Sequence, residues 1–462
     1  MYSSRTSAIQ ELVVLLTTLL EDPAQPSAPS AQPPPNYEDI LASIQRVSHE
    51  LIPETPLSTM FHDGQVHDPL GGGAYAFQND IVAPVLRALL NDEMPCATPV
   101  ETGNPTRKIF VHAGLQPNNS PHMGTIVVFC LVFAFAQAIR GRMLATAAAG
   151  GDAPPPVAVL ITFVDTAPVK DQGVKLKGIH YQRSYRDVPD ALGRYMADYQ
   201  EVLRFLSLWS GVPFSVAVQS DLFSNPVMPS LVNYMISQRA ILGPQLSPKY
   251  GSLAIRAACP IPGCGLVEKH GRLNEYQAGD DNQYGSITFH CPVHGSHTVR
   301  LSRSEEVARL EANTPTRNLL RSMSHLLDTS AHHIRVTGSD YTGMYQETLL
   351  YRPLAAWSGI TGLASGRTPH ILYAPLITDW SGAKLSKSLY VRDGAYGFMK
   401  LLGTGAFCSY AQLRDRFGAD NGEGVRKVWE EVQRWVEDPK KLFRTFSLAY
   451  LQRVILHNNL AQ

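Results

Sequence analysis

Two short tracts, far apart in the chain, contain side chains that suit phosphate chemistry. The first is PNNSPHMGT at 117–125, which lies between an apolar run at 108–114 and a long apolar stretch at 128–140. In a parallel sheet, ligands bind at the carboxyl ends of the strands, where helix N-termini attract phosphate. The sequence therefore predicts His122 at the mouth of such a crevice, with Gly124 allowing a nucleotide to approach the backbone. The alternative is a plain turn in which His122 caps the helix.

The second tract is KLSKS at 384–388, which follows the turn-rich connection DWSG at 379–382. The ammonium groups of Lys384 and Lys387 suit a polyphosphate, because they would neutralise charge that develops on a departing pyrophosphate. The neighbouring serine hydroxyls would position it. The alternative is a solvated Lys/Ser loop that binds no ligand.

Three of the six cysteines lie in a pattern that suits a metal ion. Four residues separate Cys259 from Cys264, and two separate Cys291 from His294. Thiolates and an imidazole are good tetrahedral zinc ligands, so the pattern predicts two short knuckles around a structural Zn²⁺ with no open position. Three free cysteines in an irregular loop are the competing interpretation. The alternative fourth ligands are His270, His290 and His297.

The elements that must position these tracts alternate between short apolar runs and longer helical segments. This alternation is typical of parallel strands that are covered by helices on both faces. We therefore expect an α/β fold with a Rossmann-like five-stranded parallel sheet and a helical C-terminal tail. A long insertion that holds the cysteines separates the third strand from the fourth. The expected strands are 108–114, 157–165, 214–220, 333–340 and 370–377.

Composition limits the classes of function. The chain has 462 residues, 44% of them hydrophobic, with 40 Lys+Arg and 40 Asp+Glu. The hydrophobic content argues against wholesale disorder, and the zero net charge argues against a basic nucleic-acid coat protein without excluding a local basic groove. The six cysteines are too few for a disulfide-dense secreted scaffold, which favours a cytoplasmic location. Because no uninterrupted apolar run reaches about 18 residues, we expect no membrane span, and we expect no DNA partner.

Together, the two tracts resemble the two signature sequences of class I aminoacyl-tRNA synthetases, in both their order and their separation. Gly338-Ser339-Asp340 is similar to a third element of that family, which faces the ATP and the amino acid. The resemblance covers roughly residues 105–395. The zinc-bearing insertion followed by Asp340 is most similar to class I lysyl-tRNA synthetases, although Tyr341 stands where those enzymes have His, and Thr125 stands where the family often has His or Asn.

The resemblance implies an enzyme that joins ATP, bound with Mg²⁺, to a carboxylate as an aminoacyl-adenylate. Catalysis would rest on positioning and electrostatic stabilisation by His122, Lys384 and Lys387, with no covalent nucleophile. The implied ATP-binding residues are Pro117, His122, Gly124, Thr125, Gly338, Asp340, Lys384, Ser386, Lys387 and Ser388. The implied substrate-binding residues are Asp165, Asp340 and Tyr341. An acid at the end of the second strand, Asp165, suits a basic amino acid such as arginine or lysine, and a capping or loop role is its alternative.

Composition and the resemblance also predict the domain organisation. Residues 1–104 form an N-terminal extension, in which the Pro/Ala-rich 22–35 predicts a linker. Helices are expected at 36–52 and 81–90, and the glycine triplet at 71–73 is a weak phosphate-loop signal. The other expected divisions are 105–224 and 332–395 for the two halves of the catalytic domain, 225–331 for the zinc-knuckle insertion and 396–462 for a short helical region.

The residues after the lysine tract predict two or three helices rather than the anticodon domain of a lysyl enzyme. A synthetase-like core without that domain is similar to the arginine-containing cyclodipeptide synthases of filamentous fungi. We therefore expect an enzyme that takes tRNA or aminoacyl-tRNA by its acceptor end and forms a peptide bond between arginine and a second amino acid. One alternative is a synthetase or paralogue that adenylates arginine or lysine and charges an acceptor. Another is a non-catalytic tRNA-binding module.

Overall fold

The computed structural model describes most of the chain beyond residue 80, and all of the described residues lie in the second of its two units, Gly64–Gln462. The expected linker at 22–35, the helix at 36–52 and the glycine triplet at 71–73 lie outside the described residues, as do Ser386, Lys387 and Ser388. The described ranges are 80–90, 107–149, 153–169, 172–188, 193–279, 284–343, 346–361, 370–379, 382–385, 405–418 and 422–456.

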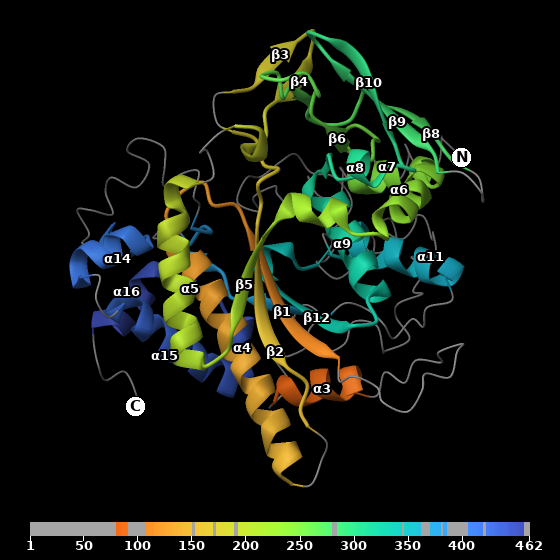
Figure 1. The fold of residues 1–462 in the computed structure, drawn as a ribbon. Coiled ribbons are helices and arrows are strands. Elements are labelled where there is room, and N and C mark those ends of the chain that lie inside the picture. Colours follow the sequence, from red (N-terminus) through yellow and green to blue (C-terminus); the bar gives the residue numbers. More distant parts are fainter. Residues whose placement is uncertain are drawn as a thin grey trace, which may run out of the picture. The chain divides into compact units, whose positions relative to one another are not determined.

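A five-stranded sheet with the order β13-β12-β1-β2-β5 forms the centre of the described fold (Figure 1). Every pairing in it is parallel, so the expected α/β class is confirmed. All five strands overlap the apolar runs that predicted them. Consecutive residues of β1 and β13 are buried, as expected for strands covered on both faces, whereas the edge strand β5 is partly exposed. The strands are β1 (Lys108–Leu115), β2 (Val157–Phe163), β5 (Phe214–Val218), β12 (Ala331–Gly338) and β13 (His370–Ala374).

Helices cover both faces of this sheet, with α4 and α5 on one side and α9 on the other (Figure 1). Helix α4 packs against β1, β2 and β12, and α5 and α15 pack against α4. The helices in the described ranges are α3 (Val82–Leu90), α4 (Met123–Ala148), α5 (Met196–Ser210), α6 (Met228–Ser237), α7 (Arg239–Leu246), α8 (Ser304–Val307), α9 (Thr314–Leu327), α11 (Arg352–Thr361), α14 (Tyr410–Phe417), α15 (Glu423–Glu437) and α16 (Leu448–Leu456).

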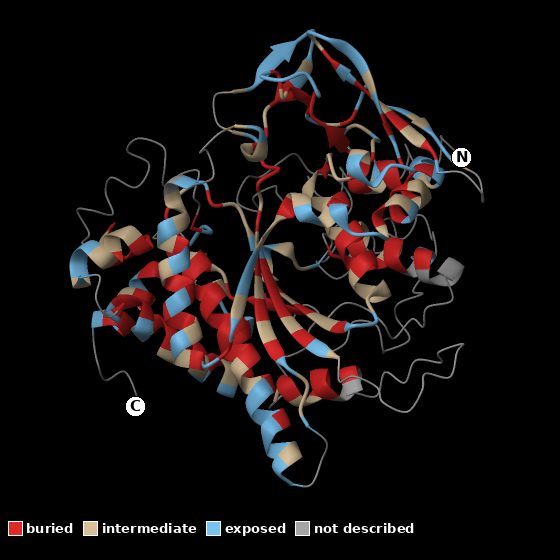
Figure 2. Ribbon diagram, in the orientation of Figure 1, coloured by how far each residue is buried: buried red, intermediate tan, exposed pale blue. Residues whose placement is uncertain are grey.

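Helix α4 contains the long apolar stretch at 128–140 and is buried on most sides up to Ala136, whereas Arg140 and Arg142 nearer its end are exposed. By length and hydropathy alone it is able to cross a membrane, but 72% of its most apolar window is buried inside the protein (Figure 2). In this structure the apolar part of the helix therefore lies in the core of the domain. Tyr199 connects α5 to α4 and to the sheet, because its ring makes edge contacts with Phe129 of α4 and Phe163 of β2.

Smaller sheets lie outside the central one. The β3-β4-β7 sheet joins the segment after β2 to the insertion between β5 and β12, and β10-β9-β8 is antiparallel. Near the C-terminal end, β15 pairs with β14, and Trp435 of α15 stacks on Phe446 of β15 with ring centroids 4.3 Å apart. The remaining strands are β3 (Val174–Leu176), β4 (Ile179–Gln182), β6 (Ile255–Ala257), β7 (Val267–Glu268), β8 (Glu275–Gln277), β9 (Ser286–Cys291), β10 (Gly295–Arg300), β11 (Leu310–Ala312), β14 (Ile377–Thr378) and β15 (Phe446–Ser447).

Candidate active site and metal centre

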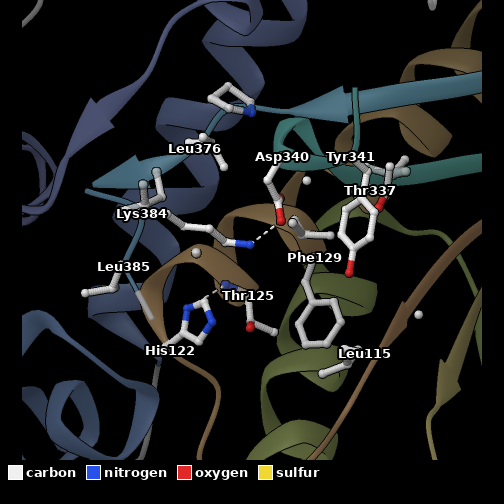
Figure 3. Close-up of a pocket in the computed structure, with 17 residues that line it drawn as sticks. Leu115, His122, Thr125, Phe129, Thr337, Asp340, Tyr341, Leu376, Lys384 and Leu385 are labelled. Atoms are coloured by element: carbon white, nitrogen blue, oxygen red, sulfur yellow. Dashed lines mark hydrogen bonds and ion pairs between the residues drawn. The ribbon is translucent and has the colours of Figure 1, made fainter. Parts of the chain in front are cut away.

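A pocket lies where the strand order of the sheet reverses. The chain runs outward from β1 through β2 to β5, and then returns to β12 and β13 on the other side of β1. In open parallel sheets, ligands bind at such a switch point, outside the carboxyl ends of the strands. The pocket takes its walls from the end of β1, the start of α4, the end of β12 and the two short segments 375–377 and 384–385 (Figure 3). The sequence-predicted residues that line it are His122, Gly124, Thr125, Gly338, Asp340, Tyr341 and Lys384.

His122 caps the first turn of α4 and also faces the pocket (Figure 3). Its Nδ1 accepts a hydrogen bond from the backbone N–H of Thr125 at 3.3 Å. Because Nδ1 accepts, Nε2 carries the proton of the neutral ring and is a hydrogen-bond donor. The N–H of Thr125 also donates to the carbonyl oxygen of His122 at 2.7 Å, so the longer bond to Nδ1 favours this tautomer without fixing it. The capping role and the site role are therefore compatible.

The segment 405–411 holds the first tract in place. The backbone N–H of Met123 donates to the carbonyl oxygen of Cys408 at 2.9 Å, and the N–H of Tyr410 donates to the carbonyl oxygen of Pro121 at 2.7 Å. These bonds fix the chain on both sides of His122. The Ser120 hydroxyl of the tract also accepts a bond from the backbone N–H of Ala411 at 3.1 Å. No motif in the sequence marked this partner segment, because on its side the bonds come from backbone groups, which any residue carries.

Lys384 and Asp340 form an ion pair across the pocket (Figure 3). Gly338 makes room for the carboxylate, because a Cβ at that position would clash with Oδ1 of Asp340. The two side chains are 49% and 28% exposed. An ion pair this open to solvent is worth only about 0–1 kcal/mol. A phosphate group is therefore able to displace the carboxylate from the Lys384 ammonium.

A tight turn brings Lys384 back towards the sheet. The backbone N–H of Gly382 donates to the carbonyl oxygen of Asp379 at 3.2 Å, and that of Leu385 donates to Ile377 at 2.8 Å. Gly382 has a φ of +80°, which favours glycine. The turn-rich sequence before the lysine tract thus positions its first lysine beside the pocket.

Within the described ranges, two of the residues expected to bind ATP or the amino acid lie outside the pocket lining. Asp165 is buried after β2, and its two carboxylate oxygens accept bonds from the backbone N–H of Ser220 at 3.0 Å and from its hydroxyl at 2.5 Å. The carboxylate therefore ties the end of β2 to the turn after β5. Pro117 is also buried and is not part of the lining. Tyr341, in contrast, lines the pocket.

The cysteine cluster forms the group of four ligands that its spacing predicted. One ligand atom from each of Cys259, Cys264, Cys291 and His294 lies within 4.8 Å of the others. The two thiols of Cys264 and Cys291 are 3.7 Å apart, and Nδ1 of His294 lies 3.4 Å from the thiol of Cys259 and 3.7 Å from that of Cys291. Ligands of a tetrahedral zinc ion would be about 3.6–3.8 Å apart. These three distances are close to that range, so the four side chains are placed to hold a zinc ion together.

The electrostatics of the thiols suit a metal as well. Burial raises the pKa of the Cys259 thiol to about 11. Burial acts in the same direction on Cys291, but hydrogen bonds from the backbone of Val293 and His294 outweigh it and lower the pKa of that thiol to about 7. Thiolates are the form that binds metal, and a bound cation would allow the remaining thiols to ionise. The five cysteines within the described ranges are all free thiols.

A second cluster, which the sequence did not reveal, consists of His112 of β1, His325 of α9 and His333 of β12. Nε2 of His112 lies 2.8 Å from Nδ1 of His333, whose Nε2 lies 2.8 Å from a carboxylate oxygen of Asp328. Burial lowers the pKa of both His112 and His325 well below 6.5. The rings of His325 and His333 stack with centroids 4.0 Å apart. A metal ion lies in the plane of each imidazole that binds it, which two such stacked rings do not allow, so hydrogen-bonded packing explains this cluster.

Comparison with known proteins gives structural neighbours only. No protein-family model matches the sequence, and no curated protein matches it either. The tyrosyl-tRNA synthetase of Aeropyrum pernix is 13% identical over 86% of this chain and 98% of its own, with a TM-score of 0.30. The arginyl-tRNA synthetase of Thermus thermophilus is 12% identical over 98% of this chain and 78% of its own, with a TM-score of 0.31. A glutamate tRNA ligase of Elizabethkingia meningosepticum is 13% identical over 62% and 53%, with a TM-score of 0.25. Identities and TM-scores this low do not decide what this chain does. The function proposed below is therefore argued from the residues of the pocket.

Proposed function

We propose that this chain is an enzyme that activates an amino acid with ATP, in the manner of class I aminoacyl-tRNA synthetases. One observation supports this above all: His122, Asp340 and Lys384 come from distant parts of the sequence and line one pocket at the strand-order reversal. A hydrogen-bond donor at a helix N-terminus and a lysine ammonium suit phosphate oxygens. A carboxylate beside them suits the α-amine of an amino acid or a ribose hydroxyl.

In the proposed reaction, a carboxylate oxygen of the amino acid attacks the α-phosphorus of ATP. The bond from that phosphorus to the bridging oxygen breaks, and pyrophosphate leaves with the electron pair. Nε2–H of His122 and the Lys384 ammonium would stabilise the phosphate oxygens as charge moves to the leaving group, with Lys387 as a further cation. Mg²⁺ bound with the ATP would neutralise part of the triphosphate charge.

Amino-acid-dependent exchange of pyrophosphate into ATP tests this proposal. We expect exchange with arginine or another basic amino acid. We also expect His122→Ala, Lys384→Ala and Lys387→Ala each to slow it by about 10²-fold, the scale of one lost transition-state contact. Lys440→Ala removes an exposed lysine in the C-terminal region and should leave the exchange rate unchanged. A folded wild-type protein that shows no exchange with any amino acid would overturn the proposal.

We further propose that the activated residue ends in a peptide bond, with arginine as one partner. The α-amine of one aminoacyl group would attack the ester carbonyl of another, so that a C–N bond forms and the tRNA hydroxyl leaves. A second step of the same kind would close a cyclic dipeptide. The sequence resemblance to arginine-containing cyclodipeptide synthases supports this, together with the carboxylate of Asp340 in the pocket.

Incubation with charged tRNA, ATP and amino acids, followed by mass spectrometry, separates the candidate activities. A linear or cyclic dipeptide that contains arginine supports peptide-bond formation. Accumulation of aminoacyl-tRNA without a dipeptide favours the synthetase alternative. Binding of tRNA with neither product favours a non-catalytic module. The proposal also includes a structural Zn²⁺ at Cys259, Cys264, Cys291 and His294, because the protein fills all four ligand positions.

A further inference from the structure

The β3-β4-β7 sheet and the loop beside it have a local excess of positive charge, although the whole chain has a net charge of +0. The exposed cations come from three described segments, 172–182, 247–253 and 267–273. The only acidic side chain in these segments is Glu268, which is buried and accepts a bond from the backbone N–H of His270 at 2.9 Å. The cations are Lys175, Lys177, Lys249, Lys269 and Arg272.

Hydrogen bonds join these segments into one surface. Lys175 and His180 are cross-strand partners in β3 and β4. The backbone N–H of Lys269 donates to the carbonyl oxygen of His180 at 2.8 Å. The guanidinium of Arg272 donates to the carbonyl oxygen of Gly178 at 3.3 Å. The cations are therefore neighbours in space and not only in composition.

An aromatic ring lies among these charges. The ammonium of Lys249 is 5.3 Å from the ring centroid of Tyr250, and the guanidinium carbon of Arg272 is 5.1 Å from it. The ring of His270 lies beside it, with centroids 4.4 Å apart. Cations that contact phosphates, next to a ring on which a base stacks, are the features by which proteins hold RNA strands.

The side of β4 that faces away from this surface packs on the cysteine cluster. Ile179 and Tyr181 of β4 pack against the cluster that contains the three cysteines, whereas His180 between them is exposed. Successive side chains of a strand point to opposite faces. The knuckles that carry the proposed zinc ligands therefore fix β4 with its other face towards solvent.

We propose that this basic face, formed by Lys175, Lys177, His180, Lys249, Tyr250, Lys269 and Arg272, binds the sugar–phosphate backbone of the RNA that delivers aminoacyl groups. The inference rests on the proposed function, since that function supplies an RNA substrate. It explains how a chain with no net charge holds a polyanion, because the cations that make the contact are gathered on one small sheet.

Fluorescence anisotropy with a labelled tRNA transcript tests the proposal. The variant Lys175→Ala/Lys177→Ala/Lys269→Ala/Arg272→Ala should raise the Kd at least tenfold. Each lost phosphate contact should also lower the slope of log K against log[salt] by about 0.7–0.9. The matched control Arg426→Ala/Lys440→Ala/Lys441→Ala/Arg444→Ala removes the same charge from the C-terminal region and should leave the Kd within about twofold of wild type. Tyr250→Leu should weaken binding without changing the salt slope, because a ring contact releases no counterion.

The outcomes separate this inference from the proposed function. Loss of tRNA binding in the basic-face variant, with an unchanged melting temperature and unchanged tRNA-independent pyrophosphate exchange, supports both. If the wild type exchanges no pyrophosphate but the basic-face variant still loses tRNA, the proposed function fails and the RNA surface stands. Equal Kd values for the two quadruple variants overturn the inference. So does tighter binding of the wild type to phosphatidylserine vesicles than to tRNA, since Val174 and Leu176 beside the cations are also exposed.

Discussion

A Cβ atom at position 124 would lie 2.9 Å from Cε1 of the His122 ring. A glycine is therefore required at this position, because the ring of the N-cap residue occupies the space that any other side chain would need. The glycine and the histidine of the first tract form one structural unit. The His122 ring keeps this orientation only if the residue two positions later has no side chain.

Gly124→Ala should displace the His122 ring and slow amino-acid activation by about 10²-fold, as the loss of the His122 contact itself would. Pyrophosphate exchange measures this effect. The control is Gly141→Ala in the same helix, where an added Cβ meets nothing within 4 Å. That change should leave activity intact and stabilise the helix by up to about 1 kcal/mol. Wild-type exchange rates in Gly124→Ala would show that the ring position is unimportant.

Lys384→Ala should reduce activation by about 10²-fold with little effect on folding, because its ion pair with Asp340 is open to solvent and contributes about 0–1 kcal/mol. Steady-state exchange and urea denaturation together check this. Asp340→Asn should likewise leave the free energy of unfolding almost unchanged, but it should raise the KM for the amino acid. A large loss of stability in either variant would indicate a structural role for the pair.

Purified protein should contain about one zinc ion per chain by elemental analysis, and chelation should lower its melting temperature, because structural zinc supplies folding free energy. Cys264→Ser and His294→Ala should lower the zinc content and the stability. His297→Ala is the control, since its Nε2 lies 3.3 Å from the carbonyl oxygen of Ala257 rather than in the ligand group. A folded wild-type protein without zinc would remove the metal site.

The buried histidines predict a loss of stability in acid. Burial lowers the pKa of His112 and His325 below 6.5, so the unfolded chain binds more protons than the folded chain under acidic conditions. Their contribution to stability is therefore complete above about pH 6.5 and declines as the pH falls below that value. Urea denaturation between about pH 7.5 and 5.5 should show a falling midpoint. His325→Gln should flatten this dependence, whereas His180→Gln, at an exposed site, should not change it.

Local patterns in the sequence were sufficient for the central sheet of this fold and for part of the site, but they did not predict the smaller sheets. Continuous apolar runs predicted each strand of the central sheet, and for β1 and β13 the reason is burial on both faces, which leaves no room for polar alternation. The spacing of Cys259, Cys264, Cys291 and His294 predicted the ligand group, because two knuckles with short gaps bring their ends together by themselves. The first tract was placed correctly at the start of α4, since a strand-to-helix turn is a local structure.

Contacts between distant segments were decided only by the tertiary structure. The sequence did not reveal that Asp165 turns to Ser220 instead of the pocket, or that His112, His325 and His333 meet. Nor did it show that cations from separate segments form one basic face beside Tyr250. A periodic pattern states which face of an element is buried, but it does not state which other element covers that face. Parallel strands pair across long connections, so the neighbours of each side chain depend on the order of strands in the sheet, which no local pattern records.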